Sequence, residues 1–212
     1  MSGVVVSVNV ARSVPAPWAG KPGTTAIDKR AVAGPVRVGT LGVAGDQQSG
    51  SLHGGPDQAV YAYSQEDAAF WAGELGRELW PGAFGENLTT AGVEASGAVI
   101  GERWRIGTAL LQVTTPRIPC TIFAGFWDVP DLIRRFTEAA RPGTYLRVLE
   151  PGVIAAGDRI DVLDRPAHGV TVAELSRARA GDRSLLPRVR QVALPERWQP
   201  WVDSVQGVKV PD

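Results

Sequence analysis

The stretch VIGERWRIGTALLQVTTPRIPC, residues 99–120, decides the expected fold and contains the single cysteine of the sequence. Apolar and β-branched residues lie on both sides of Gly107, so residues 99–113 are expected to form a β-hairpin that turns near this glycine. The second strand runs into a turn with two prolines, which fix their own φ angles and bias the preceding residues toward extended conformations. Cys120 is therefore expected at the end of a stiff turn.

Arg117 lies three residues before Cys120, and this spacing bears on the chemistry of the thiol. A nearby cation favours the thiolate, which is both the nucleophile and the metal ligand. The alternative is a buried cysteine that acts as a small hydrophobic residue, since cysteine is among the most buried residue types. The local sequence leaves both interpretations open.

Composition limits the classes of protein to consider. A chain of 212 residues fits one domain, or one domain with a small appendage. Lys+Arg and Asp+Glu both number 22, so there is no global basic field to attract nucleic acid or an anionic membrane. One cysteine excludes an intrachain disulfide and an all-cysteine zinc site, and His53 and His168 are too few for a histidine-rich metal site. The sequence lacks a signal-peptide pattern and a long apolar run, which predicts a cytoplasmic protein without membrane spans.

Strand patterns occur throughout the first three quarters of the chain. Residues 4–10 and 59–63 are predicted strands, and residues 26–41 are predicted to form a hairpin. Residues 145–149 and 154–163 are predicted to form a last strand pair. Because strands come mostly as adjacent hairpins, the pattern favours an antiparallel sheet or barrel over βαβ winding.

Helix signals lie between these strands and after them. Ser64 has the position of an N-cap, and the helix it begins is predicted to extend to Pro81. Asp128 is predicted to cap a second helix with an apolar stripe over residues 132–140. Thr171 begins a capping-box sequence, which predicts a small helical appendage over roughly the last 45 residues.

A glycine-rich polar segment contains the first candidate binding residues, Asp46 and the run from His53 to Asp57. The glycine pair Gly54–Gly55 would let the backbone approach a ligand closely and offer N–H groups to an anion. The alternative is a tight turn with solvated polar residues.

Two further clusters are candidates for a site. Glu86 and Asn87 follow a glycine, and their alternative is a loop in which the asparagine caps a turn. Lys21, Thr25 and Lys29 suit a phosphate group, although a lone lysine is usually a solvated surface charge.

Common catalytic templates are absent from the sequence. There is no GxSxG elbow, no GxxxxGK[ST] phosphate loop, no HExxH helix and no GxGxxG after a strand. A pair of Cys120 with His53 or His168 remains possible for a thiol hydrolase. This is the weakest of the candidate functions, because no third orienting group is evident.

Six motifs occur in a specific order between residues 4 and 163. They read KPGTTAIDK (21–29), GPVRVGTLGVAGDQ (34–47), HGGPDQAVYAYSQED (53–67), GENLTT (85–90), the opening stretch (99–120) and YLRVLEPGVIAAGD (145–158). In this order they resemble the MOSC domain family. The tail, with VTVAELSRARAGD and PERWQPWVD, is similar to the three-helix appendage of bacterial members.

The resemblance implies an α+β fold that is predominantly β. It consists of a MOSC-type β-barrel with peripheral helices over residues 1–166 and a three-helix C-terminal subdomain over residues 167–212. It also implies that Cys120 is the metal ligand for the molybdenum cofactor (molybdopterin). Members of this kind reduce N-hydroxylated compounds such as hydroxylamino-purines and amidoximes, with electrons from a separate reductase. The alternative is a module that carries sulfur or the cofactor, using a Cys120 persulfide. A homodimer is one expected assembly.

The matching positions give an expected site. The anionic pterin phosphate is expected among Lys21, Thr25 and Arg117, with backbone N–H groups near Gly54 and Gly55. The side of the pocket that faces substrate is expected to comprise Asp46, His53, Asp57, Glu86 and Asn87. Cys120, His53 and Asp57 are the expected catalytic residues, and His53 is a candidate proton donor because its ordinary pKa lies near neutrality.

Two positions depart from the family pattern. Ile122 stands where a lysine is common, and the loop between Asp46 and His53 lacks the usual acidic residue. Both differences bear on the expected substrate range and on the expected contacts with an electron donor.

Overall fold

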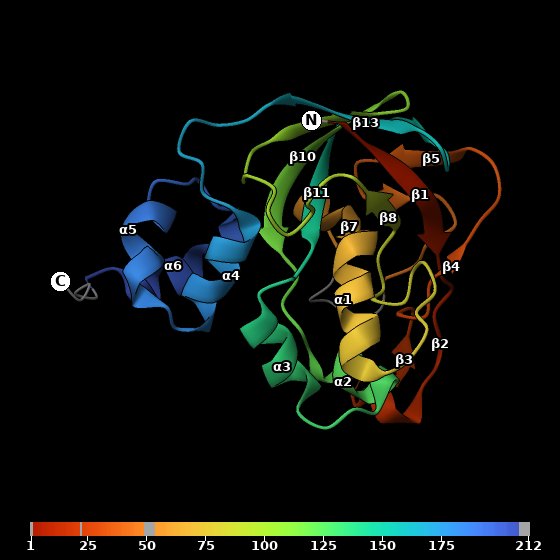
Figure 1. Cartoon of the computed structure of the whole chain (residues 1–212), viewed down its shortest axis with the longest axis horizontal. Helices are drawn as coiled ribbons and strands as arrows, with labels where there is room; N and C mark the ends of the chain where they lie inside the picture. The colour runs from red at the N-terminus through yellow and green to blue at the C-terminus, as the bar shows by residue number, and fades with distance from the viewer. Residues whose placement is uncertain (1, 22, 49–53, 208–212) are drawn as a thin grey trace.

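The computed structural model describes residues 2–21, 23–48 and 54–207 (Figure 1). Its centre is a closed barrel of seven strands, in which every neighbouring pair is antiparallel except β7 and β8. In order around the barrel these strands are β1 (Ser2–Val10), β13 (Arg159–Asp164), β9 (Arg103–Ile106), β10 (Ala109–Pro116), β11 (Thr144–Glu150), β7 (Val60–Ser64) and β8 (Leu88–Ala91). The fold is α+β and mostly β, as the sequence predicts.

Shorter strands extend this barrel at its edges. β4 (Arg30–Ala31) pairs with the end of β1. A three-stranded sheet contains β12 (Gly152–Ile154), β5 (Val36–Gly39) and β6 (Gly42–Val43), and a two-stranded sheet contains β2 (Val14–Pro15) and β3 (Thr24–Thr25).

The hairpin predicted around Gly107 is confirmed. β9 and β10 are antiparallel with Ile106 opposite Ala109, and Gly107 has a φ of 52° in the turn between them. Trp104, Ile106 and Leu111 are fully buried in the barrel interior. The prediction was possible because both the turn signal and the apolar residues lie within one short stretch.

Two other predicted strand pairs are wrong. Residues 26–41 do not form a hairpin, because β4 pairs with β1 and β5 pairs with β6 and β12. β11 and β13 do not pair with each other either, since each lies between other strands of the barrel. In both cases a strand takes its partner from a distant part of the chain, which local patterns cannot indicate.

Three helices cover one side and one end of the barrel: α1 (Gln65–Leu75), α2 (Thr121–Trp127) and α3 (Leu132–Ala139). The predicted Ser64 cap is confirmed, because its side chain accepts a hydrogen bond from the Asp67 backbone N–H at 3.1 Å. The helix ends at Gly76, which has a left-handed φ of 59°, and not at Pro81. Asp128 ends α2 and does not cap α3, which corrects the predicted start of that helix.

A cluster of aromatic side chains joins these helices to β7. Tyr63 and Phe84 stack with ring centroids 4.7 Å apart, and Phe136 of α3 lies 5.0 Å from Phe123 of α2 and 5.5 Å from Trp71 of α1. Such aromatic pairs contribute about 0.5–1.5 kcal/mol each beyond their buried area. This cluster fixes the position of α2, the helix that follows Cys120.

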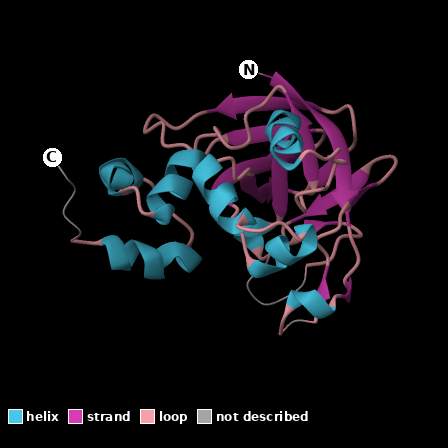
Figure 2. Cartoon of the chain, turned by 60° about the horizontal axis from the view of Figure 1, so that its bottom comes forward, coloured by secondary structure: helices cyan, strands magenta, loops and turns pink. Residues whose placement is uncertain are grey.

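The C-terminal segment forms short helices beside the barrel (Figures 1 and 2). They are α4 (Val172–Ala180), α5 (Leu186–Val189) and α6 (Gln199–Val205), with the 3₁₀ turns η3 (Arg183–Leu185) and η4 (Glu196–Trp198). The capping box predicted at Thr171 is confirmed by reciprocal hydrogen bonds with Glu174. Val172, Leu175 and Leu186 pack in the same hydrophobic cluster as the barrel interior. Two further 3₁₀ turns lie near the pocket described below, η1 (Pro17–Ala19) and η2 (Pro56–Gln58).

Candidate functional site

A pocket lies where several loops meet β3, β7 and the start of α2. Its wall contains six of the residues that the sequence predicts for a site: Thr25, Asp46, Gly54, Asn87, Arg117 and Cys120. It also contains Lys29, Gln58, Tyr61, Phe84, Ile122 and Tyr145. Residues as far apart in the chain as Thr25 and Tyr145 are thus brought to one wall.

Cys120 occupies the N-cap position of α2, directly after the proline-rich turn. Its backbone is extended, with φ −130° and ψ 172°, and the residue is partly exposed. The turn therefore places the thiol in the pocket wall. The aromatic cluster packs against α2 and fixes its position.

Arg117 is a buried cation in the same wall, with only 7% of its surface exposed. Its guanidinium lies 4.0 Å from the centroid of the Phe123 ring, and its Nη1 atom is buried without a hydrogen-bond partner. Among the residues that the structure describes, no carboxylate forms an ion pair with it. The aromatic ring compensates only part of the cost of burying this charge, so the pocket favours an anionic ligand.

Asp46 is the centre of a set of contacts that we call the Asp46 network (Ala11, Lys29, Asp46 and Asn87). One carboxylate oxygen accepts hydrogen bonds from Lys29 Nζ and, at 2.8 Å, from the Ala11 backbone N–H. The other accepts from Asn87 Nδ2 at 2.9 Å. Burial lowers the pKa of Lys29, and this effect exceeds the opposing attraction of Asp46 and Glu86. The network joins four distant segments at the pocket wall.

Glu86 does not reach the wall of the pocket, although the sequence predicts it there. Its carboxylate is fully buried and accepts hydrogen bonds from the backbone N–H groups of Gly82 at 2.6 Å and Phe84 at 3.0 Å. Thr89 Oγ1 donates a third at 2.8 Å. Burial raises the pKa of Glu86 against the effect of these bonds. The carboxylate therefore organises the loop that carries Asn87.

Asp57 also lies outside the wall. Its carboxylate accepts a hydrogen bond from Arg147 Nε at 2.7 Å, in a partly exposed ion pair. Gly55 precedes η2 with a φ of 88° and likewise does not line the pocket, whereas Gly54 does. Gly54 has a φ of 84°, in the left-handed region that other residues rarely adopt, so the turn at this position favours glycine.

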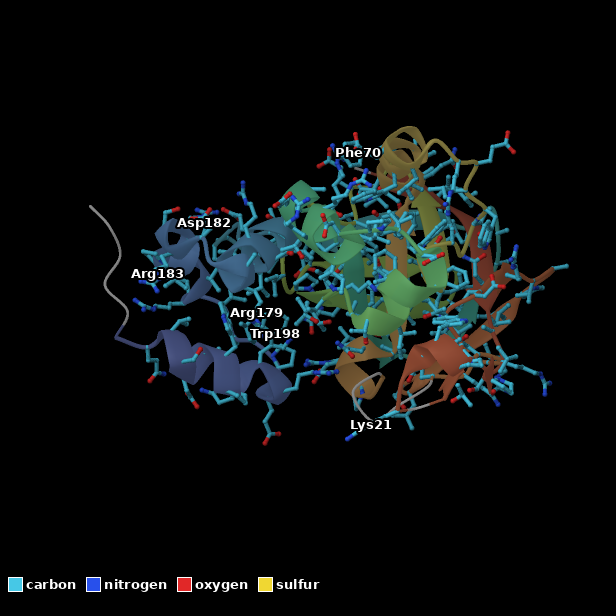
Figure 3. The ribbon with its side chains drawn as sticks, turned by 90° about the horizontal axis from the view of Figure 1, so that it is seen from below. Lys21, Phe70, Arg179, Asp182, Arg183 and Trp198 are labelled. Carbon is cyan, nitrogen blue, oxygen red and sulfur yellow. The ribbon has the colours of Figure 1, made fainter. Side chains whose placement is uncertain are left out.

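Lys21 lies at the edge of the molecule and is exposed (Figure 3). It lies in the turn that follows η1 and is not part of the pocket wall. Thr25 and Lys29, from the same stretch of sequence, do line the wall. His53 lies outside the described residues. The second histidine, His168, accepts a hydrogen bond from the Val170 N–H at 3.0 Å and lies away from this wall.

The described residues contain no group of three or more His, Cys, Asp or Glu side chains that could hold a metal ion. A metal bound at Cys120 would therefore take other ligands from a cofactor. A thiolate is a soft ligand that suits such a metal, and the buried guanidinium of Arg117 suits the negative charge of the same group. The residues of the wall thus fit an anionic, metal-containing cofactor.

Five polar wall residues were not expected from the sequence: Gln47, Gln48, Gln58, Tyr61 and Tyr145. Gln58 follows the predicted glycine turn directly, so its proximity was a usable signal. Tyr61 and Tyr145 have the pattern of ordinary strand residues, and burial raises the pKa of both hydroxyls. Only the pairing of β7 with β11 brings these tyrosines together, with rings 5.1 Å apart.

Residues 49–161 match the family model described as the MOSC domain. The chain belongs to the MOSC domain family. This confirms the resemblance, and relatives identify the chain as a YiiM-type MOSC protein. It is 36% identical over 159 residues to Protein YiiM of Escherichia coli, covering 73% of this chain and 70% of the relative. It is 34% identical over 200 residues to the uncharacterized protein YflK of Bacillus subtilis, covering 92% and 90%.

Solved structures agree with this assignment of the YiiM-type fold. YiiM from Geobacillus stearothermophilus superposes with a TM-score of 0.79 at 30% identity, covering 95% of this chain and 98% of that one. A protein of Gibberella moniliformis named Reductase is 34% identical over 178 residues. The match covers 81% of this chain but only 32% of that protein. No helix of the described residues has the length and apolar character needed to cross a membrane.

Proposed function

We propose that this YiiM-type MOSC protein binds the molybdenum cofactor through Cys120 and reduces N-hydroxylated compounds such as hydroxylamino-purines and amidoximes. The observation that carries the proposal is the wall that Cys120 shares with Arg117. One pocket is lined by a thiol that can ligate a soft metal and by a buried cation that has no carboxylate partner among the described residues. The family and the relative named Reductase support the same class of activity.

The residues of the wall would divide the binding of this cofactor. Cys120 would ligate the metal, and Arg117 would bind an anionic group of the pterin. Because Gly54 has no side chain, its backbone could approach the same group closely. When bound, the cofactor supplies a redox-active metal to which the N-hydroxyl oxygen can be transferred. Electrons would come from a separate reductase, since the sequence has no iron–sulfur, flavin or nicotinamide motif.

The experiment is to produce the protein in a host that makes molybdopterin, and to measure bound molybdenum and pterin. Reduction of benzamidoxime or hydroxylaminopurine with an artificial electron donor then tests activity. In Cys120→Ser the fold should be retained, because the side chain changes little in size, while reductase activity should fall to background. Circular dichroism and the melting temperature provide the control for folding.

Two outcomes would contradict the proposal. Full activity of Cys120→Ser with bound cofactor would exclude the cysteine as the metal ligand. Cyanide-releasable sulfur on the wild-type protein, without metal or pterin, would instead favour the sulfur-carrier function with a Cys120 persulfide.

A further inference from the structure

Reduction of an N–OH group consumes protons, and the pocket must contain a group that delivers them. His53 lies outside the described residues, and Asp57 is paired with Arg147 away from the wall. Tyr61 is a poor candidate, because its hydroxyl donates to the Pro142 carbonyl at 2.8 Å and burial raises its pKa well above the ordinary value. A better acid in the wall is the ammonium group of Lys29.

Lys29 is buried, with 6% of its surface exposed, yet it lines the same pocket as Cys120. Its Nζ atom donates to Asp46, which is fixed by the Ala11 N–H and the Asn87 amide. An ammonium has three protons, so binding to one carboxylate leaves others for a ligand. Asp46 thus fixes the position of the Lys29 side chain, while other N–H donors of the ammonium remain available to a ligand.

The charges that face Lys29 come from two other segments. Asp46 follows β6, and Glu86 precedes β8, and both attract the ammonium form. Burial opposes them and prevails, so the pKa of Lys29 lies below the ordinary range of lysine. A lysine in this condition releases its proton more readily than an exposed one, as general acid catalysis near neutral pH requires.

We infer that Lys29, positioned by Asp46, is the proton donor to the substrate nitrogen. This inference rests on the proposed reductase function. In the overall step R–NH–OH takes up two electrons and two protons, the N–O bond breaks, and R–NH₂ and water form. Lys29 gives one proton to the nitrogen, and solvent supplies the proton that completes the water. A second proton from solvent then restores the ammonium of Lys29. The separate reductase supplies the electrons.

The test compares Lys29→Arg with the matched control Lys21→Arg, which changes an exposed lysine outside the wall. Arginine keeps the positive charge and can still bind Asp46, but it does not release its proton near neutral pH. Molybdenum content of Lys29→Arg should therefore stay near that of the wild type, while turnover of benzamidoxime falls about 100-fold. Lys21→Arg should change neither quantity.

A second measurement does not depend on the arginine variant being active. The sequence has three lysines (Lys21, Lys29 and Lys209), so NMR of protein labelled with ¹³C at lysine Cε gives a simple spectrum. The signal that is lost in Lys29→Arg should titrate below the ordinary range of lysine. In Asp46→Asn this signal should titrate lower still, because the carboxylate that favours the ammonium is gone. The alkaline limb of the turnover profile should move to lower pH in the same variant.

Each outcome decides the inference. An unchanged turnover rate in metal-loaded Lys29→Arg would overturn the role of Lys29 and leave the proposed function intact. So would a Lys29 signal that titrates in the ordinary range of lysine. A wild-type protein that holds molybdenum but reduces no N-hydroxylated compound would overturn the proposed function, and this role with it.

Discussion

The pocket wall contains two groups of polar residues that differ in how well the protein satisfies them. In the Asp46 network both carboxylate oxygens are hydrogen-bonded, and Asn87 both accepts from the Tyr61 N–H and donates to Asp46. In contrast, Arg117 Nη1 and Gln58 Oε1 are buried without a partner among the described residues. A satisfied network stabilises the fold on its own, whereas unsatisfied buried atoms impose a cost that a ligand can remove. Within a single wall, the Asp46 network therefore stabilises the fold, whereas Arg117 and Gln58 are available to bind a ligand.

The strongest test of this comparison is Asp46→Ala. It leaves the buried ammonium of Lys29 without its carboxylate, so the free energy of unfolding should fall by about 3–5 kcal/mol. Urea denaturation followed by circular dichroism measures this loss. Asp164→Ala, which breaks the exposed pair with Arg103, should give no measurable change. Equal effects of the two variants would contradict the structural role of the network.

The loss in Asp46→Ala should also depend on pH. The folded-state pKa of Lys29 is already lowered by burial and falls further without Asp46, so the unfolded chain binds this proton more tightly. Stability therefore rises as the pH increases from the folded pKa toward the unfolded value of about 10.4. The deficit of the variant should be smaller near pH 10 than at pH 7.

Arg117→Met should have the opposite effect: a small change in stability and a large loss of cofactor binding. Removing an unpaired buried cation while keeping an apolar side chain of similar length should change the stability of the cofactor-free protein by no more than about 1 kcal/mol. Molybdenum and pterin occupancy should fall at least about tenfold, because the anion loses its buried partner. Lys21→Ala removes an exposed cation and should leave occupancy unchanged. Normal occupancy in Arg117→Met would exclude the guanidinium from binding.

Gln58→Met should have the smallest effect. It removes the unsatisfied amide oxygen at nearly constant volume, so the cofactor-free protein should become more stable by about 1 kcal/mol. Gln112→Met provides the matched control, since Gln112 donates to the Gly101 carbonyl at 3.3 Å and its loss should be destabilising. Thermal unfolding of the two variants compares them directly. Destabilisation by both would show that Gln58 is satisfied in solution.

Features of the fold could be predicted from the sequence where they depend on interactions between residues that are close together in the chain. The β9–β10 hairpin and the caps at Ser64 and Thr171 could be predicted, because each depends on a few neighbouring residues. The helix α2 was not predicted, since its N-cap is Cys120, whose side chain makes no capping hydrogen bond. Tertiary packing of its aromatic residues determines that helix.

In the candidate site, too, local features could be predicted from the sequence and tertiary contacts could not. Arg117 and Cys120 stand three residues apart, and the structure places both in one wall. Lys21 and Lys29 occur in one polar stretch, and the sequence pattern favoured Lys21 for the site, but Lys29 is the one that lines the wall and pairs with Asp46. That contact joins two sheets, since Lys29 precedes β4 beside β1, whereas Asp46 follows β6 of the three-stranded sheet. Whether a buried atom such as Gln58 Oε1 lacks a partner is likewise a property of the assembled fold.

The pairing of β1 with β13 has a consequence for how the chain is made. Val4 lies opposite Arg159, so the barrel closes across roughly 150 residues of sequence. During synthesis β1 leaves the ribosome first, and this edge stays unpaired until β13 follows. Non-local closure of this kind is slow compared with hairpin formation. The nascent chain therefore has an open sheet edge for most of its translation, and the barrel can close only when nearly the whole polypeptide has emerged.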